Sequence, residues 1–237
     1  MDNASYTALT RQSGLMREMQ IVANNIANSA TTGFRQEGLI FSEHVQKIEG
    51  GASLSMATGN VRQTSMMQGT LTQTAGNFDL AIEGDGFFLI ETEMGERLTR
   101  AGNFSPDAEG NLVTPNGYRV LDTGGAPVFV PPDATGISIS PDGTVSADGR
   151  PIGQVGLYQP VNPTSMIRED GVMFRTEEGF EPALDGRVLQ GFLEGSNVDP
   201  ISQIARMIEV QRAYEMGQSF LQSEDERIRN ALKSFTS

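Results

Sequence analysis

The chain has 237 residues, 38% of them hydrophobic, which excludes both a short peptide and a wholly disordered tail and is enough for a core. Its net charge of −13, without a cluster of Lys and Arg, opposes binding to phosphates, so we expect no nucleic-acid partner. The absence of Cys excludes disulfides, zinc-thiolate sites and thiol catalysis, and no run of roughly 18 to 20 apolar residues predicts a membrane span.

The first predicted element is a helix over about residues 3–30. It contains no Pro and one Gly, and apolar residues recur in alternating steps of three and four, with Gln12 interrupting the row. A narrow, heptad-like row is typical of a helix that pairs with another helix. The helix is expected to end in Thr31-Thr32-Gly33-Phe34, where Gly33 can adopt the left-handed conformation. The opening residues do not resemble a secretory signal, so any export is expected to proceed without a cleaved signal peptide.

Residues 36–75 follow as an extended, polar connector. The segment is rich in Gly, Ser, Thr, Gln and Met and has no sustained period.

Residues 76–194 are predicted to form a central β-rich domain with mostly antiparallel strands. The period changes to two, as in the alternation of Phe78, Leu80 and Ile82 with polar or small residues. Gly84-Asp85-Gly86 then leads into four apolar residues, which predicts a hairpin. Dipeptides that tolerate positive φ, such as Asp148-Gly149, mark further turns.

Residues 195–237 complete the chain with a second helix, predicted from about Pro200 to Ser234. Asp199 is suited to cap its N-terminus and Pro200 to occupy its first turn. Its apolar row has the same narrow spacing as the first helix and is interrupted by Glu224. The fold class is therefore α+β, with residues 1–35 and 195–237 forming one domain in which the two helices pair as an antiparallel, coiled-coil-like layer.

Catalytic chemistry has little support in the sequence. A single histidine excludes serine triads and multi-histidine metal sites. Most carboxylates lie beside turn glycines or on the polar face of the last helix, although a glycosidase-like pair stays formally possible. We therefore expect no catalytic, metal or cofactor-binding residues; the enzyme alternative would require two carboxylates converging in a concave pocket.

Three parts of the chain carry distinctive motifs. The N-terminal part has Ala23-Asn24-Asn25-Ile26-Ala27-Asn28 followed by Thr31-Thr32-Gly33-Phe34. The middle has the stretch from Phe78 to Phe88 and Leu98-Thr99-Arg100-Ala101-Gly102-Asn103-Phe104, and the C-terminal part has the stretch from Leu193 to Pro200 and Gln211-Arg212-Ala213-Tyr214-Glu215. Together these motifs resemble those of the flagellar basal-body rod protein family. The resemblance spans nearly the whole chain, and the N-terminal residues are similar to the proximal-rod type.

The resemblance implies a non-enzymatic structural subunit of the proximal rod, the drive shaft that spans the periplasm and transmits torque for motility. Its expected partners are copies of itself, other rod proteins and the flagellar type III export apparatus. The alternatives are a distal-rod subunit and, from a different class, a secreted binding module whose helices form a closed homo-oligomer.

We expect subunits to stack through their terminal helices in an open helical assembly rather than a ring. The three asparagines of the N-terminal motif either fix the register between subunits or cap the helix and shape the following turn. The predicted subunit-interface residues are Leu9, Met16, Met19, Ala23, Asn24, Asn25, Ile26, Asn28, Thr32, Gly33, Phe34, Asn197, Val198, Asp199, Met207, Val210, Arg212, Tyr214, Leu221 and Ile228.

Overall fold

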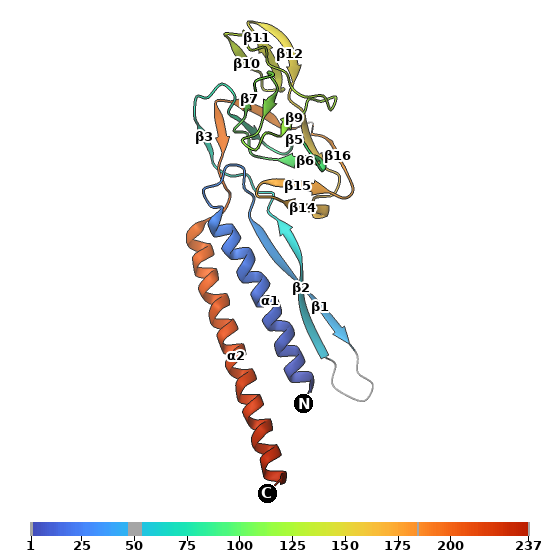
Figure 1. The fold of residues 1–237 in the computed structure, drawn as a ribbon, viewed down its shortest axis with the longest axis vertical. Helices are drawn as coiled ribbons and strands as arrows, with labels where there is room; N and C mark the ends of the chain where they lie inside the picture. The colour runs from blue at the N-terminus through green and yellow to red at the C-terminus, as the bar shows by residue number, and fades with distance from the viewer. Residues whose placement is uncertain (1, 47–53, 184, 237) are drawn as a thin grey trace. The chain divides into compact units, whose positions relative to one another are not determined.

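The computed structural model describes residues 2–46, 54–183 and 185–236 (Figure 1). Residues 1, 47–53, 184 and 237, which fall within the four predicted segments, lie outside this description. The chain divides into two compact units. The helical unit comprises Met1–Ala27, Glu37–Ser65 and Asp199–Ser237, and the β unit comprises Asn28–Gln36 and Met66–Val198.

The helical unit contains α1 (Asp2–Ala27) and α2 (Pro200–Thr236), which lie side by side. The start of α2 confirms the predicted cap, because the backbone N–H of Ile201 donates to the Asp199 carboxylate at 3.2 Å. The hydrogen bond from the Ser202 hydroxyl, followed by that from Ile201, lowers the pKa of Asp199. This end of α2 is therefore fixed by its own sequence.

The first helix ends earlier than predicted, at Ala27 rather than about residue 30. Asn28 opens a turn: its backbone carbonyl accepts from the N–H of Thr31 at 3.1 Å, and its side chain accepts from the Thr31 hydroxyl at 3.2 Å. Gly33 does have positive φ, 69°, but it lies six residues beyond the helix rather than at its cap.

A long antiparallel hairpin occupies much of the predicted connector. Strands β1 (Glu37–Gln46) and β2 (Leu54–Thr64) pair along their lengths, with a register shift between Ile40 and Phe41, and both contact α1. The strands pair through backbone N–H and C=O groups, which all residues except proline carry whatever their side chains. A polar sequence without a clear period therefore gave no signal for this hairpin.

The β unit confirms the predicted antiparallel, β-rich region. Its largest described sheet has the order β14-β15-β6-β5-β9-β8-β7, with β13 joining β5 to β16; β10-β11-β12 form a second sheet, and β17-β4 and β18-β3 pair separately. The strands are β3 (Leu71–Gln73), β4 (Leu80–Glu83), β5 (Phe87–Thr92), β6 (Gly95–Thr99), β7 (Ser105–Pro106), β8 (Leu112–Val113), β9 (Arg119–Val120), β10 (Ile137–Ile139), β11 (Thr144–Ala147), β12 (Arg150–Gln154), β13 (Leu157–Pro160), β14 (Met166–Glu169), β15 (Met173–Thr176), β16 (Phe180–Pro182), β17 (Arg187–Gln190) and β18 (Phe192–Glu194), with a short 3₁₀ turn at Pro163–Ser165.

Two expectations about turns had different outcomes. Asp148 and Gly149, both with positive φ, form the two-residue connection between β11 and β12, as predicted. The hairpin predicted at Gly84-Asp85-Gly86 was wrong: β4 pairs with β17, and β5 pairs with β6, β9 and β13. The turn connects strands of two different sheets. The pairing partners of β4 and β5 are distant in sequence or follow the turn, so the turn residues do not determine them.

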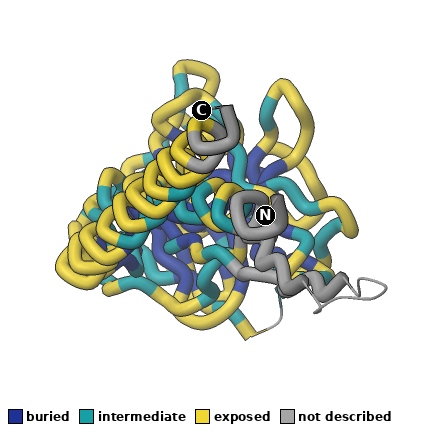
Figure 2. The backbone as a smooth tube through the Cα atoms, turned by 90° about the horizontal axis from the view of Figure 1, so that it is seen from below, coloured by how far each residue is buried: buried dark blue, intermediate teal, exposed yellow. Residues whose placement is uncertain are grey.

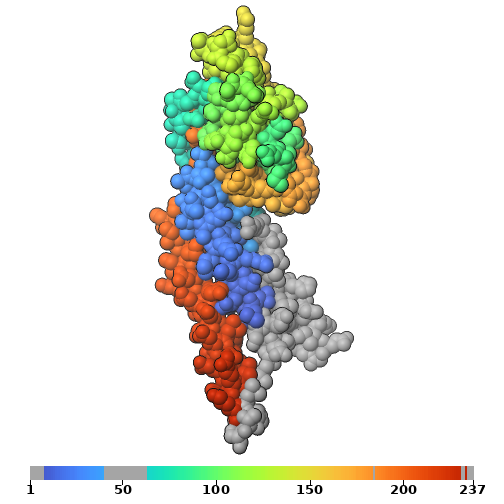
Figure 3. Space-filling model, in the orientation of Figure 1, coloured from blue at the N-terminus to red at the C-terminus, as the bar shows by residue number. Residues whose placement is uncertain are grey.

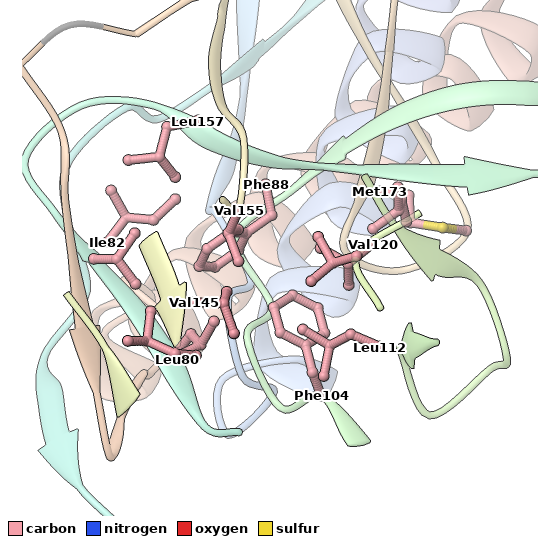
Figure 4. Packing of buried hydrophobic residues seen from close by; sticks show 14 residues of the cluster. Leu80, Ile82, Phe88, Phe104, Leu112, Val120, Val145, Val155, Leu157 and Met173 are labelled. Atoms are coloured by element: carbon pink, nitrogen blue, oxygen red, sulfur yellow. The ribbon is translucent and has the colours of Figure 1, made fainter. Parts of the chain in front are cut away.

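Strand β5 lies at the centre of the core because its four apolar residues are buried on both faces. Phe88 and Ile90 belong to one hydrophobic cluster, and Phe87 and Leu89 to another, as the alternation of side chains along a strand requires. Figure 4 shows the first cluster, in which the rings of Phe88 and Phe104 meet edge to face at 5.1 Å. Complete burial of each large side chain contributes about 1.5–3 kcal/mol, so this strand anchors the β unit.

Candidate functional site

Contacts inside the helical unit show that α1 and α2 run antiparallel. Arg206 Nε donates to Glu18 Oε1 at 2.7 Å, and Gln12 Nε2 donates to the backbone carbonyl of Tyr214 at 3.0 Å. The hydrogen bond with Glu18 raises the pKa of Arg206. Gly217 leaves room for Gln12, since a Cβ at that position would lie 3.0 Å from Gln12 Nε2. The interruption of the apolar row at Gln12 therefore marks a contact between the helices.

Asn25 of the N-terminal motif is 1% exposed and pairs with the backbone like a strand residue. Its Nδ2 donates to the carbonyl oxygen of Glu37 at 2.8 Å, while its Oδ1 accepts from the N–H of Glu37 at 3.0 Å. The same Nδ2 donates to Gln203 Oε1 at 3.1 Å. This one amide thus joins α1, β1 and α2, whereas Asn24 beside it is exposed.

The outward faces of the helices carry large apolar side chains. The residues of α2 that are not exposed include Gln203, Met207, Val210 and Gly217, which follow the heptad-like steps, and most others are exposed (Figure 2). In the space-filling view, the described part of α1 lies against α2 (Figure 3). Exposed large apolar residues of the two helices are Leu9, Met16, Ile201, Ile204, Ile208, Met216, Phe220 and Ile228.

The predicted interface residues divide into three groups by exposure in the isolated chain. The exposed ones are Leu9, Met16, Ala23, Asn24, Asp199, Arg212 and Ile228. The partly buried ones are Met19, Ile26, Asn28, Thr32, Asn197, Met207, Tyr214 and Leu221. The buried ones are Asn25, Gly33, Phe34, Val198 and Val210.

Gly33 and Phe34 dock the segment after α1 into the β unit. The N–H of Gly33 donates to the carbonyl of Glu194 at 2.7 Å, and a Cβ on Gly33 would lie 2.3 Å from the backbone nitrogen of Ala101. Phe34 is fully buried, and the guanidinium of Arg168 lies 4.3 Å from its ring centre and 4.7 Å from that of Phe174. Only glycine, which has no Cβ, lets residue 33 lie this close to the backbone of Ala101.

A buried ionic triad lies directly beyond Phe34. Glu194 is within 2.9 Å of Arg35 Nη2 and 3.1 Å of Arg100 Nη1, all three side chains are 1% exposed, and the N–H of Gly69 donates to Glu194 at 2.9 Å. Burial lowers the pKa of Arg35, and burial together with the charge of Arg35 lowers the pKa of Arg100 to about 10; Glu194 opposes both shifts. Glu194 thus compensates two buried cations at once.

Asn197, near the C-terminal end of the β unit's sequence, joins separate segments of the β unit by hydrogen bonds. Its Oδ1 accepts from the N–H of Gln36 at 2.6 Å, its Nδ2 donates to the carbonyl of Met67 at 2.7 Å, and its N–H donates to the carbonyl of Phe34 at 3.3 Å. Arg35 Nη1 also donates to the carbonyls of Met66 and Met67. The N-terminal and C-terminal motifs therefore meet within one unit.

Sequence reasoning missed Glu18, Arg35, Arg168, Glu194 and Arg206 as functional residues. Glu18 and Arg206 had a detectable signal, because a charged residue next to an apolar row can pair across two helices. The others depend on partners roughly 90 to 160 positions away, and no local pattern reports such pairs.

Two of the hollows in the described part of the β unit are compared with the enzyme alternative. One, of about 590 Å³, is lined by Glu91, Glu93, Asp107 and Glu109, with Arg119 within 3.8 Å of both Glu91 and Glu109. Desolvation raises the pKa of Asp107, but hydrogen bonds from Asn111 outweigh it and hold that pKa below its ordinary value, the opposite of what a general acid needs.

The other hollow, of about 220 Å³, is lined by Thr31, Thr32, Ile90, Ala101 and Tyr118 among others, and it places the predicted Thr32 at the surface of the β unit. Within the described ranges, no three His, Cys, Asp or Glu side chains gather in a way that suits a metal ion. Neither helix, over its described length, has a stretch apolar enough to cross a bilayer.

An α+β chain with apolar rows on the outer faces of paired helices, and with its motif residues tied into its own fold, is a structural protein built for association. Family models agree: "Flagella basal body rod protein" matches residues 6–35, "Flagellar hook protein FlgE/F/G D1 domain" matches residues 81–147, and "Flagellar basal body rod FlgEFG protein C-terminal" matches residues 189–234.

Similar proteins give the same result over the full length. The chain is 39% identical to the flagellar basal-body rod protein FlgF of Caulobacter vibrioides over 98% of both chains, and 36% identical to FlgF of Mesorhizobium japonicum over 91% of this chain and 90% of that protein. It is 33% identical to FlgG of Bacillus subtilis over 93% of this chain and 94% of that protein. The chain belongs to the flagellar basal-body rod protein family, whose members are structural proteins and not enzymes.

Proposed function

We propose that this chain is a structural subunit of the proximal rod of the bacterial flagellum, in the role of FlgF. The similarity to two FlgF proteins at 39% and 36% identity supports the proximal type over the distal, FlgG type. The observation that carries the assembly role is the set of apolar side chains exposed on α1 and α2, because exposed apolar rows stabilise a protein only when another surface covers them.

In this proposal the paired helices form a coiled-coil-like polymer-core domain made of residues 1–35 and 195–237. The exposed predicted residues Leu9, Met16 and Ile228, with Ile204 and Ile208, contact neighbouring subunits directly. The partly buried predicted residues border this surface. The buried ones, such as Asn25 and Val210, hold the helices in the geometry that the neighbours contact.

The neighbours are further copies and other rod proteins, stacked head to tail around an axis without closing into a ring. The subunit leaves the cytoplasm through the flagellar type III export apparatus, without a cleaved signal peptide, and takes its place in the rod as it crosses the periplasm. Torque then passes through the packed helices, with residues 76–194 forming the outer layer and residues 36–75 joining the two.

A complementation experiment tests this function. The tagged chain is expressed in a strain that lacks FlgF. Basal bodies are then isolated and probed for the tag. We expect the wild-type chain to restore swimming and to co-purify with basal bodies, and the double variant Ile204→Ser/Ile208→Ser to lose both while its helical circular dichroism stays unchanged. The matched control is Gln211→Ser/Gln218→Ser, two exposed polar positions on α2.

The alternatives make different predictions in the same strain. Recovery of the wild-type chain as a finite soluble oligomer, absent from basal bodies, would favour the closed binding module. Restored swimming in a strain that lacks FlgG, but not in one that lacks FlgF, would assign the chain to the distal rod.

A further inference from the structure

The polypeptide passes between the helical unit and the β unit four times, at 27/28, 36/37, 65/66 and 198/199. We call the residues within about five positions of these points the crossing segments. A single extended strand bends and twists easily, because each residue has two soft dihedral angles. A chain that transmits torsion between its units needs these segments to act together.

Within the helical unit, hydrogen bonds of the Asn25 amide connect three crossing segments. Asn25 lies just before the first crossing, Glu37 directly after the second, and Gln203 soon after the fourth. Both backbone groups of Glu37 are bound to the Asn25 side chain, at 2.8 and 3.0 Å, and the third bond to Gln203 completes its donors. The Asn25 side chain is buried, so water does not compete for these bonds.

Within the β unit, Arg35 and Asn197 gather the other ends. Arg35 donates to the carbonyls of Met66 and Met67, next to the third crossing. Asn197, next to the fourth crossing, binds Gln36 at the second and Met67 at the third. Glu194 pairs with Nη2 of the Arg35 guanidinium at 2.9 Å. Each unit therefore ties three crossing segments to one another with its own side chains.

We propose that Asn25 in the helical unit, and Arg35 with Asn197 in the β unit, are positioning residues that each hold three crossing segments together within their own unit, so that torsion loads these segments together rather than one strand at a time. The inference rests on the proposed role as a rod subunit. It also gives Asn25 a task that neither subunit register nor helix capping describes.

The first test measures amide hydrogen exchange on the purified full chain. Asn25→Asp keeps the size of the side chain and its acceptor for Glu37, but it replaces the donor with a carboxylate oxygen. We expect exchange about tenfold faster around Glu37 and Gln203, as the loss of a buried hydrogen bond implies. Asn24→Asp is the control, with the same charge change at an exposed neighbour.

Further variants keep the test informative if the buried carboxylate unfolds the chain. Gln203→Leu removes the acceptor of one Asn25 hydrogen bond and leaves both bonds to Glu37 in place. Asn197→Asp acts in the β unit, where it should speed exchange around Gln36 and Met67. Asn116→Asp, in an exposed turn of the β unit, is its control. Exchange at the crossing segments that matches the controls in all three variants would overturn the inference.

The second test places the variants in cells. We expect Asn25→Asp and Asn197→Asp to enter basal bodies in normal amounts but to lose swimming in viscous medium at least twofold more than in buffer, with the controls unaffected. Equal losses in both media would refute a role in transmitting torsion. Absence of the wild-type chain from basal bodies would refute the proposed function instead, and the exchange measurement would still decide whether the side chains tie the segments.

Discussion

The guanidinium of Arg35 lies 2.9 Å from the carboxylate of Glu194, and both side chains are 1% exposed. The two residues stand almost at opposite ends of the β unit's sequence, one in the N-terminal motif and the other in the C-terminal motif. With Arg100 they form the most completely buried charged group described in the chain.

Replacement of Glu194 by Gln should destabilise the β unit by about 3–5 kcal/mol, because two buried guanidinium groups lose their only paired carboxylate in the described structure. Urea unfolding of the full chain, followed by exchange in β-unit peptides, measures the loss. The control is Glu91→Gln, which removes a 51% exposed partner of Arg119 and should cost at most about 1 kcal/mol. Equal losses would contradict a special role for the triad.

Replacement of Gly33 by Ala should cost more than the positive φ alone explains. The added Cβ would lie 2.3 and 2.4 Å from backbone atoms of Ala101 and Arg100, which cannot move aside as a flexible side chain can. The matched control is Gly117→Ala, with φ of 85° and open space around it, for which we expect about 1–2 kcal/mol. Thermal unfolding should rank Gly33→Ala well below the control, and similar melting temperatures would show that the segment can shift.

Replacement of Arg168 by Lys should destabilise the docking of Phe34 although the charge is kept. A planar guanidinium stacks between the rings of Phe34 and Phe174, and an ammonium does not, so we expect a loss of about 1–2 kcal/mol. Proteolysis rates around residues 33–36 report it. Arg150→Lys, at the exposed first residue of β12, should leave the rate unchanged.

The stability of the β14–β15 region should fall in acid through Glu169. Its hydrogen bonds with Arg97, at 2.6 Å, and Arg175, at 2.9 Å, outweigh desolvation and lower its pKa below the ordinary value of 4.5. A carboxylate with a lowered folded pKa contributes stability above its unfolded pKa, and that contribution is lost as the pH falls through the folded value. The loss should begin below about pH 5.

Exchange rates of β14–β15 peptides, measured from neutral pH into acid, test this window. Glu169→Gln should flatten the acid-dependent change and leave a lower, pH-independent stability. A variant that keeps the full acid dependence would assign it to other carboxylates.

The sequence predicted those features that depend on neighbours in the chain. The narrow apolar rows predicted both helices, and Asp199 and Pro200 predicted where α2 starts. Asp148-Gly149 predicted the turn between β11 and β12. The partner of β4 could not be predicted in this way, since β17 lies about a hundred residues downstream and the glycine-rich turn is equally compatible with a local hairpin.

The motif asparagines illustrate the same limit at the candidate site. The sequence left two roles open for them, subunit register or helix capping, and only the structure shows that Asn25 pairs with Glu37 while Asn28 shapes the following turn. The pairing of Asn25 with β1 could not be inferred because the hairpin itself had no sequence signal. The exposure of Ile204 and Ile208 was missed for a related reason: a helix with apolar residues on two faces does not reveal which face its partner covers.

The division of the helical unit into separate stretches of sequence has a consequence for folding. Asn25 and Gln203 are 178 positions apart, so closing that loop from a disordered chain costs about 4–5 kcal/mol of entropy. Once the β unit has joined Gly33 to Glu194, only about 17 flexible residues remain in the loop, and the cost falls by about 2 kcal/mol. Prior folding of the β unit therefore lowers the entropy cost of the contact between the terminal helices, and we expect that contact to form more readily once the residues between them have folded.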